Sequence, residues 1–149
     1  MIHVQEQKRV VAVQPQLKND GAFANNTYWD RSGFKHERIE IIVGETDAAV
    51  GSTTSGAAPK IEECDTAGGS YTDVSGAALS AAIAATDDNK VFGIDVDLRK
   101  THKRYGRVNA PTAAAGTTGV NLAIICTLSM SDLTPKDAAG QGLAELVSA

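Results

Sequence analysis

Residues 120–130 read Val-Asn-Leu-Ala-Ile-Ile-Cys-Thr-Leu-Ser-Met, and this stretch decides the fold class. Every second residue from Val120 to Met130 is apolar, whereas Asn121, Thr127 and Ser129 lie among the residues between them. Side chains along a strand point alternately to its two faces, so this period of two predicts a strand with one face in a core.

The same alternation recurs along the rest of the chain. Six further stretches are predicted to be strands, in chain order 9–14, 36–43, 60–64, 71–74, 91–98 and 104–108. Two connectors, 51–59 and 110–119, contain small uncharged residues and are expected to be surface loops. The alanine-rich stretch 77–85 is expected to be a short helix or an irregular edge strand.

Short strands joined by polar turns, with little helix, predict an all-β protein. We expect an antiparallel β-sandwich, jelly-roll-like, that forms a single domain over residues 1–149. The core is expected over about residues 18–131. An extended N-terminal arm of about residues 1–17 and an extended C-terminal arm of about residues 132–149 are expected to flank it.

Composition and charge limit the classes of function. The 149 residues are 42% hydrophobic and 21% charged, which allows a packed core. The net charge of -4 counts against a dedicated nucleic-acid binder. No stretch approaches the ~20 apolar residues of a membrane span, and no secretory signal is visible. We therefore expect cytoplasmic synthesis, with neither nucleic acid nor a membrane as a partner.

The sequence shows no motif for catalysis or for a cofactor. His3, His36 and His102 are far apart, and none has zinc-site spacing with a cysteine. Neither a Gly-x-Ser-x-Gly elbow nor a P-loop occurs. We therefore predict no catalytic, cofactor-binding or metal-ligating residue, no cofactor and no enzyme activity. Cys64 and Cys126 are expected to be reduced and buried, although a disulfide between them is left open.

Asp95 and Asp97 are the carboxylates that most resemble a reactive pair. Because they are two residues apart on a strand, they share one face. Paired carboxylates occur in glycosidases and in calcium sites. The alternation places these two opposite Phe92 and Ile94, however, which favours a solvent-exposed strand face. The same interpretation applies to the acidic residues Glu62, Glu63 and Asp65.

A basic cluster over residues 99–104 carries four positive charges. It allows a contact with phosphate or nucleic acid, but the negative net charge favours a charged turn between two strands. Such a turn could pair with the acidic strand before it or with an acidic neighbouring subunit. The aromatic residues Tyr28, Trp29 and Phe34 allow a sugar-binding platform. Packing of these rings beneath a loop is the favoured interpretation.

A series of motifs follows a defined order between about residues 30 and 130. These are Asp30–Phe34, Arg38–Asp47, Pro59–Asp65, Gly69–Gly76, Asp88–Val91, Asp95–Arg99 and Lys103–Val108. They include a strand that ends in Val-Gly, a Lys-hydrophobic-Glu strand, a Tyr-x-Asp-Val-x-Gly turn and a Val-Asp-Leu-Arg hairpin. In this order the motifs resemble a group of small virion proteins of tailed bacteriophages that are encoded among head genes.

The resemblance implies a structural protein of the capsid exterior, namely a head decoration or cement protein with a jelly-roll-like fold. Proteins of this type are often trimeric, and the implied partner is the major capsid protein. The implied location is the outer surface of the virion, after synthesis in the host cytoplasm. Three alternatives stay open: a carbohydrate-binding or host-adhesion module on the virion, a structural component of the tail or neck, and a small jelly-roll hydrolase that uses Asp95 and Asp97 or a metal site without a sequence motif.

Overall fold

The computed structural model describes residues 6–24, 28–52, 57–132 and 138–145. These residues form eleven strands and no α-helix. The strands are β1 (Lys8–Lys18), β2 (Gly21–Ala22), β3 (Trp29–Asp30), β4 (His36–Thr46), β5 (Val50–Ser52), β6 (Lys60–Cys64), β7 (Thr72–Ala78), β8 (Val91–Asp97), β9 (Tyr105–Val108), β10 (Pro111–Ala113) and β11 (Val120–Ser129). Each of the seven predicted strands overlaps one of them.

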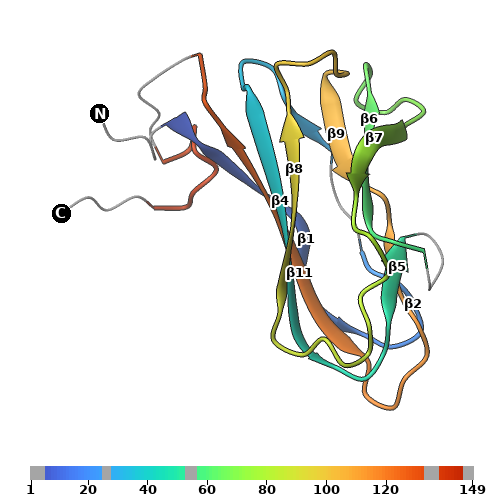
Figure 1. Ribbon diagram of the computed structural model, residues 1–149. Coiled ribbons are helices and arrows are strands. Elements are labelled where there is room, and N and C mark those ends of the chain that lie inside the picture. The colour runs from blue at the N-terminus through green and yellow to red at the C-terminus, as the bar shows by residue number, and fades with distance from the viewer. Residues whose placement is uncertain (1–5, 25–27, 53–56, 133–137, 146–149) are drawn as a thin grey trace.

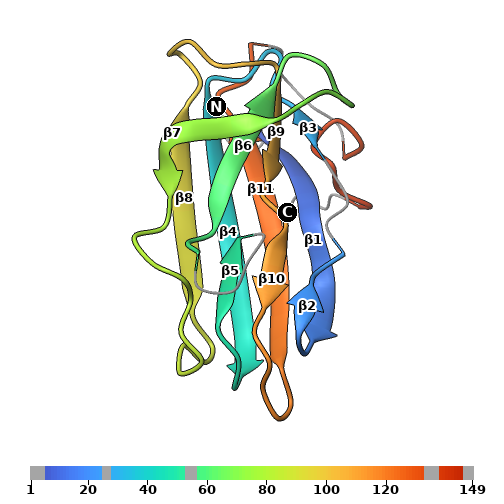
Figure 2. The same cartoon turned by 90° about the vertical axis from the view of Figure 1, so that its right-hand side faces the viewer.

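The strands form three antiparallel sheets that pack as an all-β sandwich, as predicted. The four long strands form one layer in the order β1-β11-β4-β8. The second layer is divided into two smaller sheets, β3-β9-β6-β7 and β2-β10-β5. Figure 1 shows the two layers facing each other, and Figure 2 shows the two smaller sheets one above the other across the long strands.

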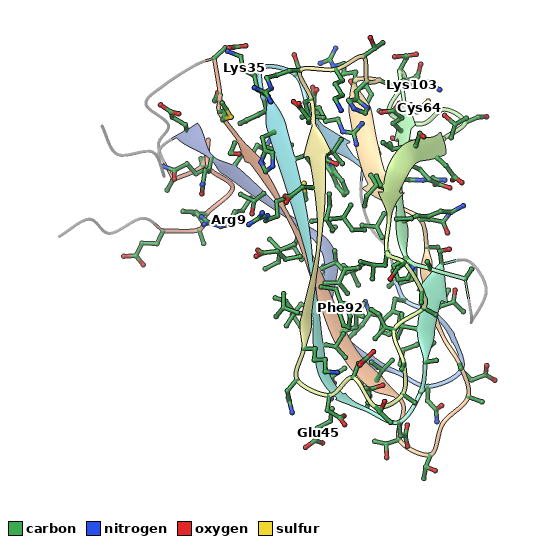
Figure 3. The ribbon with its side chains drawn as sticks, in the orientation of Figure 1. Arg9, Lys35, Glu45, Cys64, Phe92 and Lys103 are labelled. Carbon is green, nitrogen blue, oxygen red and sulfur yellow. The ribbon has the colours of Figure 1, made fainter. Side chains whose placement is uncertain are left out.

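The core lies between the layers and is mainly aliphatic. On β11, the residues from Val120 to Leu128 alternate between buried and more accessible positions, which confirms the period-two prediction. Ile39 and Ile41 of β4 point inward beside them, and Ile61 and Val108 enter from the second layer. Figure 3 shows side chains of both layers filling the space between them. Few aromatic residues are needed because aliphatic side chains from two inner faces fill a thin sandwich.

The stretch that was expected as an N-terminal arm differs from the prediction. Residues 8–18 form β1, which pairs with β11 along its whole length, and Ala12 and Val13 are fully buried. The register shifts between Val11 and Val13 and again before Gln16. Such irregularities interrupt the period of two, so the amphipathic pattern of this strand is weak in the sequence.

Part of the expected C-terminal arm also contacts the sandwich. The backbone N–H of Arg9 donates a hydrogen bond to the carbonyl of Gln141 at 2.7 Å, and Gln141 is buried. Residues 133–137 and 146–149 of this arm, and residues 1–5 of the N-terminal arm, lie outside the described residues.

Two connectors that were expected to be surface loops contain short buried strands. β5 lies at the start of the first connector and β10 at the start of the second, and the two strands pair with each other. The alanine-rich stretch 77–85 forms no helix. Its first two residues complete the edge strand β7, and Ile83 forms an isolated bridge to Val50. Sequence patterns did not indicate β5 and β10 because strands of three residues are too short to show a period.

Candidate interaction surfaces

The outer face of the four-stranded layer carries an exposed apolar patch. Register aligns Ala123, Ile42 and Val91 in one row across three strands, and Val11 with Ile125 in another. Val91 is 61% exposed, the largest value among the exposed large hydrophobic residues. We define the outer patch as Val11, Leu17, Ile42, Val91, Ala123 and Ile125. Contiguous exposed apolar surface on a rigid sheet is typical of an interaction site.

A shallow groove of about 390 Å³ crosses the outer patch beside β1. Pro15 and Leu17 of β1, Ala123 of β11, and Ile42 and Gly44 of β4 line it. Proline has no backbone N–H and is tolerated in strands mainly at edges and bulges. Pro15 lies where the register of β1 is irregular. The groove is therefore a consequence of the bulged edge strand.

Charged residues cover the other end of this outer face. Both oxygens of Asp95 accept hydrogen bonds from the Arg38 guanidinium, at 2.8 and 2.7 Å. These hydrogen bonds lower the pKa of Asp95. Asp97 accepts hydrogen bonds from Arg99, and its pKa falls to about 2. The two aspartates thus lie toward solvent, as predicted, and each is paired with its own arginine.

Ser129, His36 and Asp95 form a hydrogen-bonded chain that the sequence did not indicate. Ser129 Oγ lies 3.1 Å from His36 Nδ1, and His36 Nε2 lies 3.3 Å from Asp95 Oδ1. The connectivity is that of a hydrolase triad. The Asp95 carboxylate is already neutralised by Arg38, however, and the Asp95 side chain is 51% exposed. Catalytic triads work in water-excluded sites, so the exposure of Asp95 and its pairing with Arg38 distinguish this arrangement from such a triad.

The aromatic residues 28, 29 and 34 have different environments. Trp29 is buried, and Phe34 packs against the core. Tyr28 is 48% exposed and packs edge-on against Tyr105, with ring centroids 5.5 Å apart. The Arg104 guanidinium lies over the Tyr105 ring at 5.1 Å. The prediction that the rings are packed is therefore correct for Trp29 and Phe34. Tyr28 instead lies at the surface of the second layer, beside Tyr105 and Arg104.

The basic cluster forms the turn between β8 and β9. Arg99 pairs with Asp97 of the preceding strand, and Arg104 pairs with Asp30. The favoured interpretation of this cluster as a charged turn that pairs with the acidic strand is therefore confirmed. Lys100 has no ion-pair partner in the part of the chain that the structure describes.

A buried ionic network links the two layers. Arg31 donates to both oxygens of Glu37, at 2.7 and 2.9 Å, and the Trp29 indole donates to one of them at 2.7 Å. Arg31 also donates to Glu63 at 2.7 Å, and His102 Nδ1 lies 2.9 Å from the same Glu63 oxygen. Burial opposes the charge of Arg31, but hydrogen bonds and charges of the two glutamates raise its pKa overall.

One sequence signal could have revealed this network. Glu37 lies on the inward face of β4, the same face as Ile39 and Ile41, and it is 0% exposed. A carboxylate at an inward position requires a cation and hydrogen-bond donors, because burying an unpaired charge is very costly. The identity of its partner, Arg31, depends on how the preceding turn folds over the strand.

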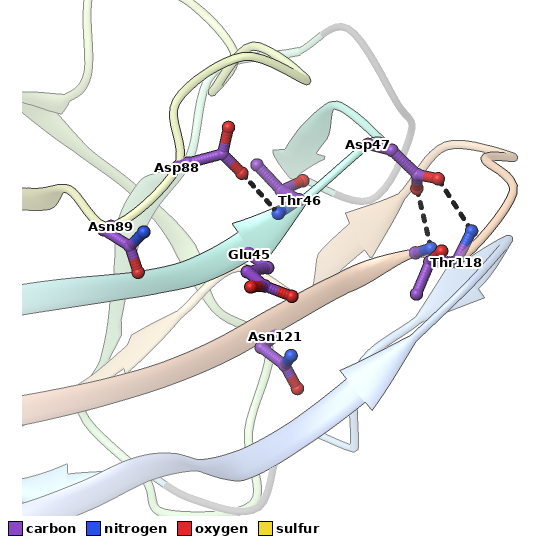
Figure 4. A pocket seen from close by; sticks show the side chains of 8 residues that line it. Glu45, Thr46, Asp47, Asp88, Asn89, Thr118 and Asn121 are labelled. Atoms are coloured by element: carbon purple, nitrogen blue, oxygen red, sulfur yellow. Dashed lines mark hydrogen bonds between the residues drawn. The ribbon is translucent and has the colours of Figure 1, made fainter.

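A cleft of about 480 Å³ at the opposite end of the sandwich contains three carboxylates (Figure 4). Asp47 accepts hydrogen bonds from the backbone N–H groups of Thr117, Thr118 and Gly119, and these bonds lower its pKa. Asp88 accepts a hydrogen bond from the Thr46 backbone at 2.7 Å. These two carboxylates therefore fasten loops. Within the described residues, no group of histidine, cysteine and acidic side chains is suited to a metal ion.

The two cysteines are free and buried, as predicted. Burial raises the pKa of the Cys126 thiol well above its ordinary value. Among the described residues no helix is long and apolar enough to cross a membrane. No protein-family model, curated protein or solved structure matches this chain.

Proposed function

We propose that the chain is a structural protein of a tailed-bacteriophage virion, which binds the outer surface of the capsid and bridges major capsid protein subunits. It acts without catalysis and associates as a homotrimer. The observation that carries the proposal is the outer patch, an exposed apolar surface on a sheet of four long strands. The motif order between about residues 30 and 130 supplies the phage context.

The outer patch has the chemistry of a protein-binding surface. Val11, Leu17, Ile42 and Val91 are exposed on three strands of one sheet, and polar or charged residues border them. Removing such side chains from water contributes about 25 cal/mol for each Å² of apolar area that is buried. A cement protein that repeats a modest contact in every subunit of a trimer gains avidity without a single strong site.

The fold suits a protein that must resist mechanical separation. β1 and β11 pair over the whole of β1, and β11 pairs with β4 over nearly its full length. Backbone hydrogen bonds along these long ladders keep the patch residues in fixed register. A rigid binding face loses little conformational entropy on contact. The net charge of -4 fits an outward position on a shell rather than contact with packaged DNA.

The direct test is binding to heads of the virus that encodes the chain, prepared without this protein. We expect the wild-type protein to bind and to add density on the outer shell in cryo-electron microscopy. Ile42→Lys, in the centre of the outer patch, is expected to weaken binding about tenfold or more, because a charge replaces a buried apolar contact. Ser80→Lys, an exposed position between β7 and β8, is the matched control.

Three outcomes separate the candidate positions and assemblies. Density confined to the tail or neck would replace the capsid proposal with a tail or neck role. No binding to any part of the particle would overturn the virion proposal. Sedimentation of the purified protein tests the homotrimer, and a stable monomer at high concentration would contradict it.

A second candidate function, carbohydrate binding on the virion, is favoured by one observation. Tyr28 presents an accessible ring beside Tyr105 and Arg104, and tyrosine rings of this kind bind the apolar faces of sugars. A glycan array with the wild-type protein and with Tyr28→Ala tests this function. Binding that Tyr28→Ala removes would support it, and the absence of glycan binding would reject it.

A further inference from the structure

The two edge strands of the four-stranded layer, β1 and β8, differ in how far other segments cover them. At the β1 edge, the backbone of Arg9 is hydrogen-bonded to Gln141, so residues 138–142 cover this end of the edge. Gly142 lies so close that an added Cβ would be 1.9 Å from the Arg9 carbonyl oxygen. Covering an edge with the chain's own backbone prevents other strands from pairing there.

Among the described residues, no such segment covers the β8 edge. The Val43 N–H donates to the Lys90 carbonyl, and the Leu98 N–H donates to the Lys35 carbonyl. The even-numbered residues of β8 therefore point their backbone N–H and C=O groups toward β4. In an antiparallel strand the alternate residues point their N–H and C=O groups the other way. Val91, Gly93 and Asp95 therefore direct their backbone groups away from the sheet. β8 is the last strand of its sheet, and no strand of the described ranges pairs with it on this side.

A cleft of about 440 Å³ lies beside this edge. β7, the edge strand of the other layer, lines one side of the cleft with residues 74–77, and β8 lines the other with Asp95 to Asp97. Both strands lie on the same side of the sandwich (Figure 2). Lys100 and His102 close one end of the cleft. The cleft thus lies between two strand edges, which is a suitable place for an extended chain.

Charge indicates what kind of chain fits. Asp95 and Asp97 are neutralised by Arg38 and Arg99. Lys100 is the cation of the cleft that has no ion-pair partner among the described residues, so it leaves this end of the cleft positive. Outside the cleft, at the start of β8, Val91 is strongly exposed at the edge of the apolar row that includes Ile42. An occupant would therefore match Val91 with an apolar residue and Lys100 with an acidic one.

We propose that the β8 edge is a strand-acceptor site, which binds an extended acidic segment of the major capsid protein by main-chain pairing with Val91, Gly93 and Asp95. The proposal rests on the function proposed above, because the capsid subunit supplies the segment. β-strand addition of this type obtains affinity from backbone hydrogen bonds and specificity from alternate side chains. A second copy of the chain is the competing occupant.

Gly93→Pro and Gly93→Ala form a matched pair for the test. Proline removes the N–H that points away from the sheet and leaves the bonds to β4 intact. Alanine keeps that N–H, and its Cβ would meet only the Ile39 carbonyl, at 4.0 Å. We expect Gly93→Pro to bind heads about tenfold or more weakly than Gly93→Ala, because both the donor and the close approach of a strand are lost. Lys100→Glu is expected to weaken binding more than Lys100→Gln.

Hydrogen exchange on the wild-type protein provides a measurement without substitutions. The amides of Val91, Gly93 and Asp95 are expected to exchange quickly in the free protein and to become protected on heads. If the protein binds heads while these amides stay unprotected and the two Gly93 variants bind equally, the strand-acceptor site is refuted and the capsid function stands. If the wild-type protein binds no heads, both proposals fail. If the amides are already protected in the free oligomer and exchange again in Gly93→Pro, the occupant is a second copy and the capsid segment is rejected.

Discussion

Gly106→Ala tests whether the buried ionic network holds the two layers together. The Cβ of an alanine at this position would lie 2.7 Å from Arg31 Nε, 2.7 Å from Trp29 Nε1 and 2.8 Å from Arg31 Cζ. Nothing shorter than about 3 Å is tolerated between such atoms, so the guanidinium and the indole must move. Both groups donate to Glu37, which is fully buried. The substitution therefore separates a buried carboxylate from its donors without removing any of them.

The magnitude follows from the interactions that are lost. Three hydrogen bonds reach the Glu37 carboxylate, two from Arg31 and one from Trp29. Breaking a buried ion pair so that one charge is left uncompensated costs about 3–5 kcal/mol. We expect the free energy of unfolding to fall by about that amount. For a chain of this size each kcal/mol lowers the melting temperature by about 2–4 °C, so the melting temperature should fall by roughly 6–20 °C.

The assay is urea unfolding followed by far-ultraviolet circular dichroism, with Gly93→Ala as the control. Both glycines lie within strands and neither has a backbone in the left-handed region, but an alanine at position 93 would have no contact closer than 4.0 Å. We expect the control to change the free energy of unfolding by less than about 1 kcal/mol. Equal stability of the two variants, with equal dependence on urea, would refute the role given to Gly106 and to the network.

Three further predictions concern other parts of the molecule. The pKa of Asp97 is lowered to about 2, so its contribution to stability is present above about pH 4 and is lost as the pH falls toward 2. Asp97→Asn should flatten the loss of stability measured by urea unfolding over that range, and an unchanged pH profile would contradict this. Gly142→Ala should detach the C-terminal segment from Arg9 and speed amide exchange in β1 while the melting temperature changes little; unchanged exchange would show that the segment tolerates the Cβ. Because Cys64 and Cys126 are free, a reducing agent should not change the melting temperature, and a decrease would indicate a disulfide.

Local patterns were sufficient for the strands that have one regular inner face. β4, β8 and β11 each alternate over seven residues or more, and this alternation follows directly from the geometry of an extended chain. The same reasoning placed Asp95 and Asp97 on the solvent side. β1 was recognised only in part because its register shifts between Val11 and Gln16. β5 and β10 were missed because small residues become strands there through pairing with each other and burial.

Alternating apolar residues along the chain were enough to establish the all-β class and the direction of most strand faces. Which residues far apart in the sequence contact each other was decided only by the tertiary structure. Ser129 meets His36 because antiparallel register pairs β11 with β4. Arg31, which follows β3, meets Glu63 of β6 because both strands pair with β9. The open β8 edge and the covered β1 edge likewise depend on where residues 138–142 lie in space. Alternation is a property of neighbouring residues, whereas register and edge protection are set by the packing of segments that lie far apart in the sequence.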